Sequence, residues 1–289
     1  SLGLNRQIID TGGVLEMVDN RFDVSGRVVI ITGAGQGIGR DYGLAFAEAG
    51  AIPVLAEING DNLGSVASEI ESRGGKTLAI ETDVGSPDSV NSMVAQTLDT
   101  YGKIDILINN AAIFATIPRR DFTDIPYDEW NNVLHVNVTG SYLCACAVVP
   151  AMREARQGRI VNISSGTVPQ GVPGFMHYVT SKAAVVGMTR VMARELGDYN
   201  INVNAIMPGY TETEVEHAQI VEAALGDYQQ ALVIDRLADL CNLNGGSQAL
   251  AALSGRVTYL LENLGPVEKI GKHTSELQSQ SNLVCRLLL

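Results

Sequence analysis

A tyrosine and a lysine four positions apart could together carry acid–base chemistry. Tyr178 and Lys182 fall in a stretch with helical character, so their phenol and ammonium groups share one face. Ionising a free tyrosine, whose pKa is about 10, costs roughly 4 kcal/mol at pH 7. One ammonium about 4 Å away supplies roughly 4 kcal/mol at an effective dielectric near 20. The spacing also fits a surface pair, but Ser165, which ends an Ile-Ser-Ser run upstream, favours a general base site.

A second candidate site is the glycine-rich segment from Thr32 to Gly39, which follows an apolar run and opens an amphipathic stretch. Glycines there let the backbone turn sharply out of a strand and bring free N–H groups against a pyrophosphate. The segment fits T-G-x-x-x-G-x-G and not G-x-G-x-x-G, because Ile38 stands where the third glycine belongs. Plain turns also use glycine, but the position after the first strand predicts nucleotide binding.

The acidic residue at the end of the next apolar run, Glu57, predicts which dinucleotide binds. A carboxylate there accepts hydrogen bonds from the ribose hydroxyls and repels a 2′-phosphate. Neither Gln36 nor Ile58, the neighbours where a phosphate-binding base could stand, is basic, and Arg40 is expected on a solvated helix surface. NAD is therefore predicted over NADP. A solvated carboxylate at a strand end is the alternative role of Glu57.

The elements that must position these residues alternate between short strands and longer helices. The expected strands are near-continuous apolar runs, which is typical of parallel strands covered on both faces. They are Val28–Thr32, Ile52–Ala56, Thr77–Glu81, Ile106–Asn109, Arg159–Ile163 and Asn202–Ile206. The expected helices lie near residues 37–50, 61–73, 87–102, 128–155 and 177–197. This alternation predicts an α/β fold: a Rossmann-type doubly wound, mostly parallel sheet with helices on both faces, in a single domain.

Length and terminal composition suggest the boundaries of that domain. The 289 residues allow one large domain or two small ones, and no repeat or proline-rich linker divides the chain. One domain is therefore expected over residues 17–265, atypical from about residue 214. Residues 1–16, before Met17, are interpreted as a leader or cloning-derived extension, and residues 266–289 as a tail.

Overall charge and composition exclude several classes of protein. With 20 basic and 32 acidic side chains, the net charge of −12 argues against a nucleic-acid partner. No apolar run reaches the roughly 18–20 residues of a membrane span, and the start lacks the plan of a secretory signal. We therefore expect a cytoplasmic protein without membrane contact. The four cysteines and four histidines show no metal-ligand spacing, so no metal site is expected.

Taken together, the motifs resemble those of the short-chain dehydrogenase/reductase family, from about Val24 to Thr213. They occur in the order of that family. They are Thr32-Gly33-x-x-x-Gly37-Ile38-Gly39, Asp83-Val84, Asn109-Asn110-Ala111, Asn137, Ser165, Tyr178, Lys182 and Pro208-Gly209 with Thr213.

The resemblance implies a catalytic set of four residues. Tyr178 would exchange a proton with the substrate hydroxyl or carbonyl, and Ser165 would hydrogen-bond the same oxygen. Lys182 would bind the ribose hydroxyls and lower the pKa of Tyr178. Asn137 would hold a water that links Lys182 to solvent.

The resemblance also implies a nicotinamide cofactor, NAD in preference to NADP. Asp83 and Val84 would lie at the adenine, Asn110 and Ala111 at the adenosine ribose, and the segment from Pro208 at the nicotinamide. The implied cofactor contacts are Gly33, Gln36, Gly37, Ile38, Gly39, Glu57, Asp83, Val84, Asn110, Ala111, Tyr178, Lys182, Pro208, Gly209, Thr211 and Thr213.

The implied activity is hydride transfer between that cofactor and a small secondary alcohol or ketone, in a homo-oligomer (dimer or tetramer). The expected substrate pocket comprises 113–117, 167–172, His177 and a lid from Tyr210. One alternative is an NADP-linked 3-oxoacyl-thioester reductase, for which Arg119-Arg120 is the candidate docking patch, although a solvated loop is the plainer interpretation. Another is a family member that binds dinucleotide without productive turnover.

The sequence departs from the family at two places. Ala112 stands where the family has glycine, which is tolerable if the backbone there does not need a positive φ. After Thr213, a lid is plausible over Glu212–Ala231, but no Val-Asp-Gly-Gly-like turn or convincing seventh strand follows.

Overall fold

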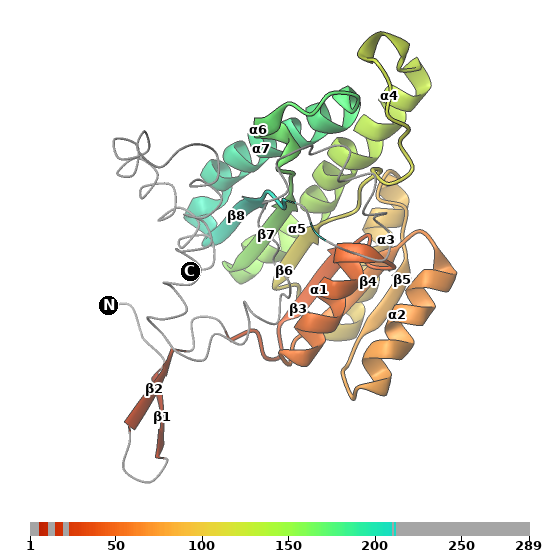
Figure 1. Cartoon of the computed structure of the whole chain (residues 1–289). Coiled ribbons are helices and arrows are strands. Elements are labelled where there is room, and N and C mark those ends of the chain that lie inside the picture. Colours follow the sequence, from red (N-terminus) through yellow and green to blue (C-terminus); the bar gives the residue numbers. More distant parts are fainter. Residues whose placement is uncertain (1–5, 11–14, 20–22, 210, 212–289) are drawn as a thin grey trace.

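The computed structural model describes residues 6–10, 15–19, 23–209 and 211. Its main feature is a six-stranded sheet in the order β5-β4-β3-β6-β7-β8 (Figure 1). The strands are β3 (Val28–Thr32), β4 (Ile52–Glu57), β5 (Leu78–Glu81), β6 (Ile106–Asn109), β7 (Gly158–Ile163) and β8 (Ile201–Ile206). Every pairing in this sheet is parallel. The winding direction reverses between β3 and β6, and parallel sheets bind ligands outside the strand ends at such a point.

Helices cover both faces of the sheet. They are α1 (Gly37–Glu48), α2 (Gly60–Ser72), α3 (Pro87–Tyr101), α4 (Tyr127–Leu134), α5 (Ser141–Ala155), α6 (Thr167–Gln170) and α7 (Met176–Leu196). Single helical turns lie at η2 (Phe122–Asp124), η3 (His135–Gly140) and η4 (Gly197–Tyr199). The predicted doubly wound Rossmann-type fold is therefore confirmed.

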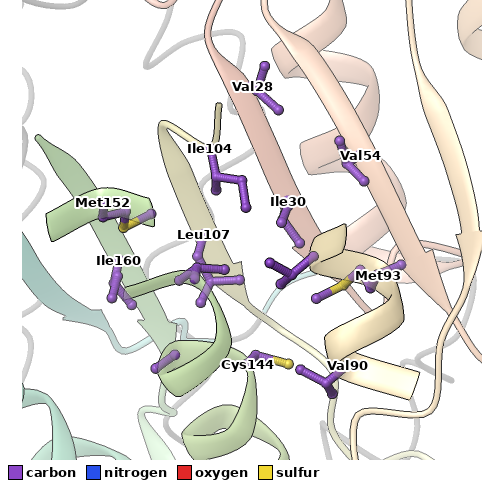
Figure 2. Packing of buried hydrophobic residues seen from close by; sticks show 14 of the residues in the cluster. Val28, Ile30, Val54, Val90, Met93, Ile104, Leu107, Cys144, Met152 and Ile160 are labelled. Carbon is purple, nitrogen blue, oxygen red and sulfur yellow. The ribbon is translucent and has the colours of Figure 1, made fainter. Parts of the chain in front are cut away.

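Alternate residues of each strand pack on opposite helix layers. Val28 and Ile30 belong to the core cluster that includes α3 and α5 residues, such as Met93 and Cys144 (Figure 2). Val29 and Ile31 belong to a second cluster with residues of α1 and α2. Because side chains of a strand alternate between faces, a strand buried on both sides must be apolar throughout. This is why continuous apolar runs identified the strands from sequence.

The observed strand bounds agree with the predicted ones to within one residue, and the helices differ more. The long helix expected over residues 128–155 is interrupted, because η3 is a π-helical turn between α4 and α5. Such turns are frequent at functional sites. This one carries Asn137, whose side chain bonds to a neighbouring loop as described below.

The N-terminal region differs from expectation. Within residues 1–16 no packing pattern was predicted, yet β1 (Arg6–Asp10) pairs antiparallel with β2 (Leu15–Asp19). Both segments contain apolar residues, and Gly12-Gly13 between them is the sequence signal for a turn. The pairing brings Arg6 opposite Asp19.

In the described part of the chain, one helical stretch, Tyr127–Ala155, is long and apolar enough to cross a membrane by those two criteria alone. Its buried side chains Cys144, Val148 and Met152 belong to the sheet core.

Candidate active site

A cavity of about 710 Å³ lies where the carboxyl ends of the strands meet. Most of the predicted site residues line it, although they come from segments far apart in the chain. These are Gly33, Gln36, Gly37, Ile38, Gly39, Glu57, Asp83, Val84, Asn110, Ala111, Ser165, Tyr178, Lys182, Pro208 and Gly209. Thr211 and Asn137 are not among the lining residues. Thr213, Tyr210 and the expected lid lie outside the described residues.

The glycine-rich segment is locked by side chains of the neighbouring strand end. Asn110 Nδ2 donates to the carbonyl oxygens of Thr32 (3.0 Å) and Gly33 (3.1 Å). Thr32 Oγ1 in turn accepts hydrogen bonds from the backbone N–H groups of Asn110 (3.0 Å) and Ala111 (3.1 Å). The amide of Asn110 therefore supports the backbone of the segment.

Two positions in the segment require glycine. Gly33 has a φ of +64°, and a Cβ there would lie 2.8 Å from the Ala111 Cα. A Cβ on Gly39 would overlap the Gly33 carbonyl oxygen and crowd the Asn110 amide. The segment and the start of α1 can therefore approach each other this closely only without side chains.

The N-terminus of α1 opens onto the cavity, which Gln36, Gly37 and Ile38 line. The Gln36 side chain makes no capping hydrogen bond, and the first turn of α1 contains no acidic residue. The positive end of the helix dipole and its N–H groups favour an anion at such a place. The glycine-rich segment and this end of α1 together fit the pyrophosphate of a dinucleotide.

The carboxylate of Glu57 is held by two backbone groups. Its Oε2 accepts from Gly35 N and its Oε1 from Asn59 N, each at 3.0 Å. Arg40, the nearest base in the sequence, is bound elsewhere. Its guanidinium donates to Glu69 Oε2 at 2.7 Å and 3.1 Å. Arg40 is thus tied to α2 by an ion pair, a more specific arrangement than the solvated helix surface that was expected.

Tyr178 and Lys182 are both buried on α7. The Lys182 ammonium donates to the Ile163 carbonyl oxygen at 2.8 Å and lies 5.7 Å from the centre of the Tyr178 ring. Burial lowers the pKa of Lys182 to about 8. Ser165 Oγ, in the same cavity, accepts hydrogen bonds from the N–H (3.2 Å) and the hydroxyl (3.0 Å) of Thr167.

Asn137 lies behind the cavity and joins two of its walls. Its Oδ1 accepts from Ile113 N at 2.8 Å, and its Nδ2 donates to Ser181 Oγ at 3.0 Å. Its carbonyl oxygen accepts from Ser141 Oγ at 3.0 Å. The side chain therefore links the loop after β6 to α7. The water-binding role of Asn137 stays a prediction.

The Pro208–Gly209 segment lies beside Ser165. Ser164 N donates to the Ile206 carbonyl oxygen (2.7 Å) and Gly166 N to that of Pro208 (2.8 Å). Ala112, the departure from the family pattern, also lines the cavity. In the described residues, positive φ values outside glycine occur at Arg156 and Asn200 only, so the backbone at Ala112 does not require glycine.

An aromatic wall, which we define as Phe114, Phe175 and Tyr178, closes one side of the cavity. The Phe114 ring centre lies 4.5 Å from that of Tyr178 and 5.8 Å from that of Phe175. The sequence analysis included Phe114 and missed Phe175, as well as the lining residues Asn132, His135 and Val136. Phe175 precedes the first residue of α7, so helical spacing from Tyr178 gave no signal for it.

One expectation about the pocket is wrong. His177 does not line the cavity: it is fully buried, and its Nε2 lies 3.1 Å from Glu129 Oε1. Adjacent helix residues point in different directions, so His177 faces α4 while Tyr178 faces the cavity. Arg119 is exposed in the loop after β6, as the solvated-loop interpretation expects, and Arg120 Nη2 pairs with Glu129 Oε2 at 3.1 Å.

Comparisons with known proteins show the family of the chain. The family model described as short chain dehydrogenase matches residues 27–223. The chain is 39% identical over 190 residues to the (2S)-[(R)-hydroxy(phenyl)methyl]succinyl-CoA dehydrogenase subunit BbsD of Thauera aromatica, covering 66% of this chain and 75% of that one. It is 39% identical over 192 residues to the 3-oxoacyl-[acyl-carrier-protein] reductase FabG of Thermotoga maritima, covering 66% and 76%.

Solved structures are similar as well. A short-chain type dehydrogenase/reductase from Mycobacterium marinum is 38% identical, with a TM-score of 0.70 and coverage of 78% of this chain and 89% of that one. An NAD⁺-bound xylitol dehydrogenase is 34% identical, with a TM-score of 0.64 and coverage of 69% and 75%.

Proposed function

Because the chain belongs to the short chain dehydrogenase family and is an oxidoreductase acting on CH–OH groups, we propose that it transfers hydride between NAD and a neutral secondary alcohol or ketone. One observation carries the proposal. Tyr178, Lys182 and Ser165 line the same cavity as the glycine-rich segment and the N-terminus of α1. This cavity therefore offers one place for a hydroxyl-bearing substrate and a dinucleotide to meet.

The proposed roles follow from the chemistry of the side chains. Bound nicotinamide supplies the hydride acceptor or donor. Tyr178 takes the proton of the substrate hydroxyl during oxidation and returns it to the carbonyl oxygen during reduction. Ser165 Oγ hydrogen-bonds the same substrate oxygen and holds it in position. The Lys182 ammonium, beside the Tyr178 ring, favours the ionised phenol electrostatically.

The preference for NAD over NADP is supported by charge. Glu57 lines the cavity with its carboxylate fixed by Gly35 and Asn59, where it would repel a 2′-phosphate. Arg40, which could neutralise such a phosphate, is engaged by Glu69.

The substrate is proposed to be neutral and partly apolar. The aromatic wall, with Val172 and Ile113, borders the cavity near Tyr178. Among the described lining residues, Lys182 is the only lysine or arginine, and its ammonium is bonded to Ile163. The described lining of the cavity therefore has no second lysine or arginine to hold an anionic substrate.

A second candidate is an NADP-linked 3-oxoacyl-thioester reductase, which the 39% identity to the Thermotoga maritima reductase favours. Two observations oppose it. Glu57 disfavours the 2′-phosphate, and the Arg119-Arg120 patch is engaged within the protein. Arg120 pairs with Glu129, and Arg119 Nε donates to the Pro173 carbonyl oxygen at 3.2 Å.

Assembly and location are also proposals. Exposed apolar side chains on α5 and α7, namely Tyr142, Met176 and Val191, support packing of these helices in a dimer or tetramer. We propose a cytoplasmic location, since the apolar 127–155 stretch contributes Cys144, Val148 and Met152 to the sheet core. Light scattering of the purified chain tests the oligomeric state.

The test of function follows NADH absorbance with a panel of secondary alcohols and ketones, in parallel with NADPH and 3-oxoacyl thioesters. The proposal expects turnover of neutral alcohols or ketones with NAD(H). Faster thioester reduction with NADPH would instead support the second candidate. Binding of NADH without turnover of any substrate would support a binding-only protein.

A further inference from the structure

Three charged or titratable side chains form a connected group beside the aromatic wall. Glu129, on α4, receives Arg120 Nη2 at its Oε2 and His177 Nε2 at its Oε1, each at 3.1 Å. Arg120 belongs to the loop after β6, and His177 directly precedes Tyr178 on α7. We call Arg120, Glu129 and His177 the Glu129 clamp. It joins three elements through one carboxylate.

The loop that leads into α7 is attached to the same place. Arg120 N donates to the Gly174 carbonyl oxygen, and Arg119 Nε donates to that of Pro173, each at 3.2 Å. The Arg119 guanidinium also lies 5.8 Å from the centre of the Phe175 ring. Both joined segments, 112–120 and 170–175, contribute cavity-lining residues. The clamp therefore ties together two walls of the cavity next to Tyr178.

The Glu129 clamp is not explained by its contribution to the free energy of unfolding alone. His177 is fully buried, and within the described part of the chain its Nδ1 has no hydrogen-bond partner. Arg120 Nε is also buried without a partner there. Buried polar atoms left unsatisfied cost free energy, and ion pairs of this kind often add little stability over apolar packing. A better physical reason for such an arrangement is that it holds the joined segments in one fixed geometry.

We propose that Glu129 is a positioning residue: by holding His177 and Arg120 it fixes the start of α7, and hence the Tyr178 phenol, against the Phe114 ring. The inference rests on the proposed role of Tyr178 as acid/base. Glu129 acts through its neighbours, since it does not line the cavity. Misplacing a reacting group by about 1 Å can cost on the order of 100-fold in rate.

The variants Glu129→Ala and Glu129→Gln test the proposal. The alanine variant removes both contacts, so we expect kcat to fall on the order of 10–100-fold. The glutamine variant retains an acceptor for His177 and should lose less. The Kd of NADH, measured by fluorescence, should stay unchanged in both, because the clamp does not touch the glycine-rich segment.

Asp105→Asn is the matched control. Asp105 likewise has two side-chain partners, Arg27 (2.8 Å) and Lys103 (2.9 Å), and a side-chain exposure of 12%, against 23% for Glu129. It precedes β6 at the amino end of the sheet, away from the cavity. We expect a lower Tm with unchanged kcat and KM. An equal loss of kcat in both variants, or wild-type kcat in Glu129→Ala, overturns the positioning role.

Amide hydrogen exchange of the full chain separates this inference from the proposed function. Glu129→Ala should speed exchange in segments 112–126 and 171–175 but not in the glycine-rich segment, whatever the substrate. Unchanged exchange in those segments contradicts the clamp even if the enzyme is active. Faster exchange in an enzyme that turns over no alcohol or ketone supports the clamp and refutes the proposed function.

Discussion

The Lys182 ammonium lies 5.7 Å from the centre of the Tyr178 ring while it donates a 2.8 Å hydrogen bond to the Ile163 carbonyl oxygen. The two side chains stand one helical turn apart on α7, and the carbonyl belongs to the last residue of β7. Helix spacing brings the lysine near the phenol, and the strand end holds it there. The relationship therefore depends on both elements.

Tyr178→Phe should remove nearly all turnover, lowering kcat roughly 10²–10⁴-fold, and leave cofactor binding nearly intact. The change removes only the phenolic oxygen, whose proton transfer contributes roughly 10²–10⁴-fold to the rate. Steady-state kinetics and NADH fluorescence titration measure the two effects separately. Retention of most activity would refute the acid/base assignment.

Lys182→Met should change how stability depends on pH. Burial lowers the pKa of Lys182 from 10.5 to about 8. Between these values the unfolded chain keeps the proton that the folded chain has released, so the free energy of unfolding rises with pH. Below pH 8 both states carry the proton, and the folded state bears the cost of burying the charge.

Relative to Lys182→Met, the wild type should gain up to about 3 kcal/mol of unfolding free energy as pH rises from about 8 to 10.5. Urea unfolding at several pH values in that window, without cofactor, measures the difference. A constant difference between the two proteins would show that Lys182 titrates normally.

Gly39→Ala should weaken cofactor binding, because the new methyl group overlaps the Gly33 carbonyl oxygen and the segment must shift. We expect the Kd of NADH to rise by about tenfold or more, with a loss of roughly 1–3 kcal/mol in stability. Gly64→Ala is the matched control, since a Cβ at that position in α2 meets nothing within 4 Å. It should be stabilising by up to about 1 kcal/mol and leave binding unchanged.

Glu57→Gln should shift cofactor preference toward NADP, because it removes the negative charge and keeps the shape of the side chain. The ratio of kcat/KM for NADP to that for NAD should rise on the order of tenfold. Glu81→Gln is the control: Glu81 is the register partner of Glu57 on β5 but does not line the cavity. An equal shift of this ratio in both variants would mean that it follows the overall surface charge and not repulsion of the 2′-phosphate by Glu57.

Much of the fold could be predicted because its signals are local. The start of α3 follows from Ser86, whose side chain caps Ser89 N, and from Pro87 in the first turn. Its end follows from Gly102, which has a left-handed φ of +70°. The helix bounds near 87–102 therefore needed no knowledge of the rest of the chain.

Features that depend on distant partners were missed. The π-helical turn at η3 could not be separated from the flanking helices by periodicity, because its side-chain bonds run to Ile113 and Ser181. The ion pair of Arg120 was missed for the same reason. Glu129, the partner of Arg120, stands nine positions away on another element, and no regular spacing in the sequence predicts this pair.

The sequence by itself determined the order along the chain of the six strands of the parallel sheet, the glycine-rich segment and the four-residue spacing of Tyr178 and Lys182. These follow from backbone geometry and side-chain alternation within single elements. Only the tertiary structure decided that Asn110 supports the Gly33 backbone, that Ile163 anchors Lys182, and that His177 faces Glu129 and not the cavity. Such contacts join elements far apart in the chain, and the packing of helices on the sheet sets which groups meet.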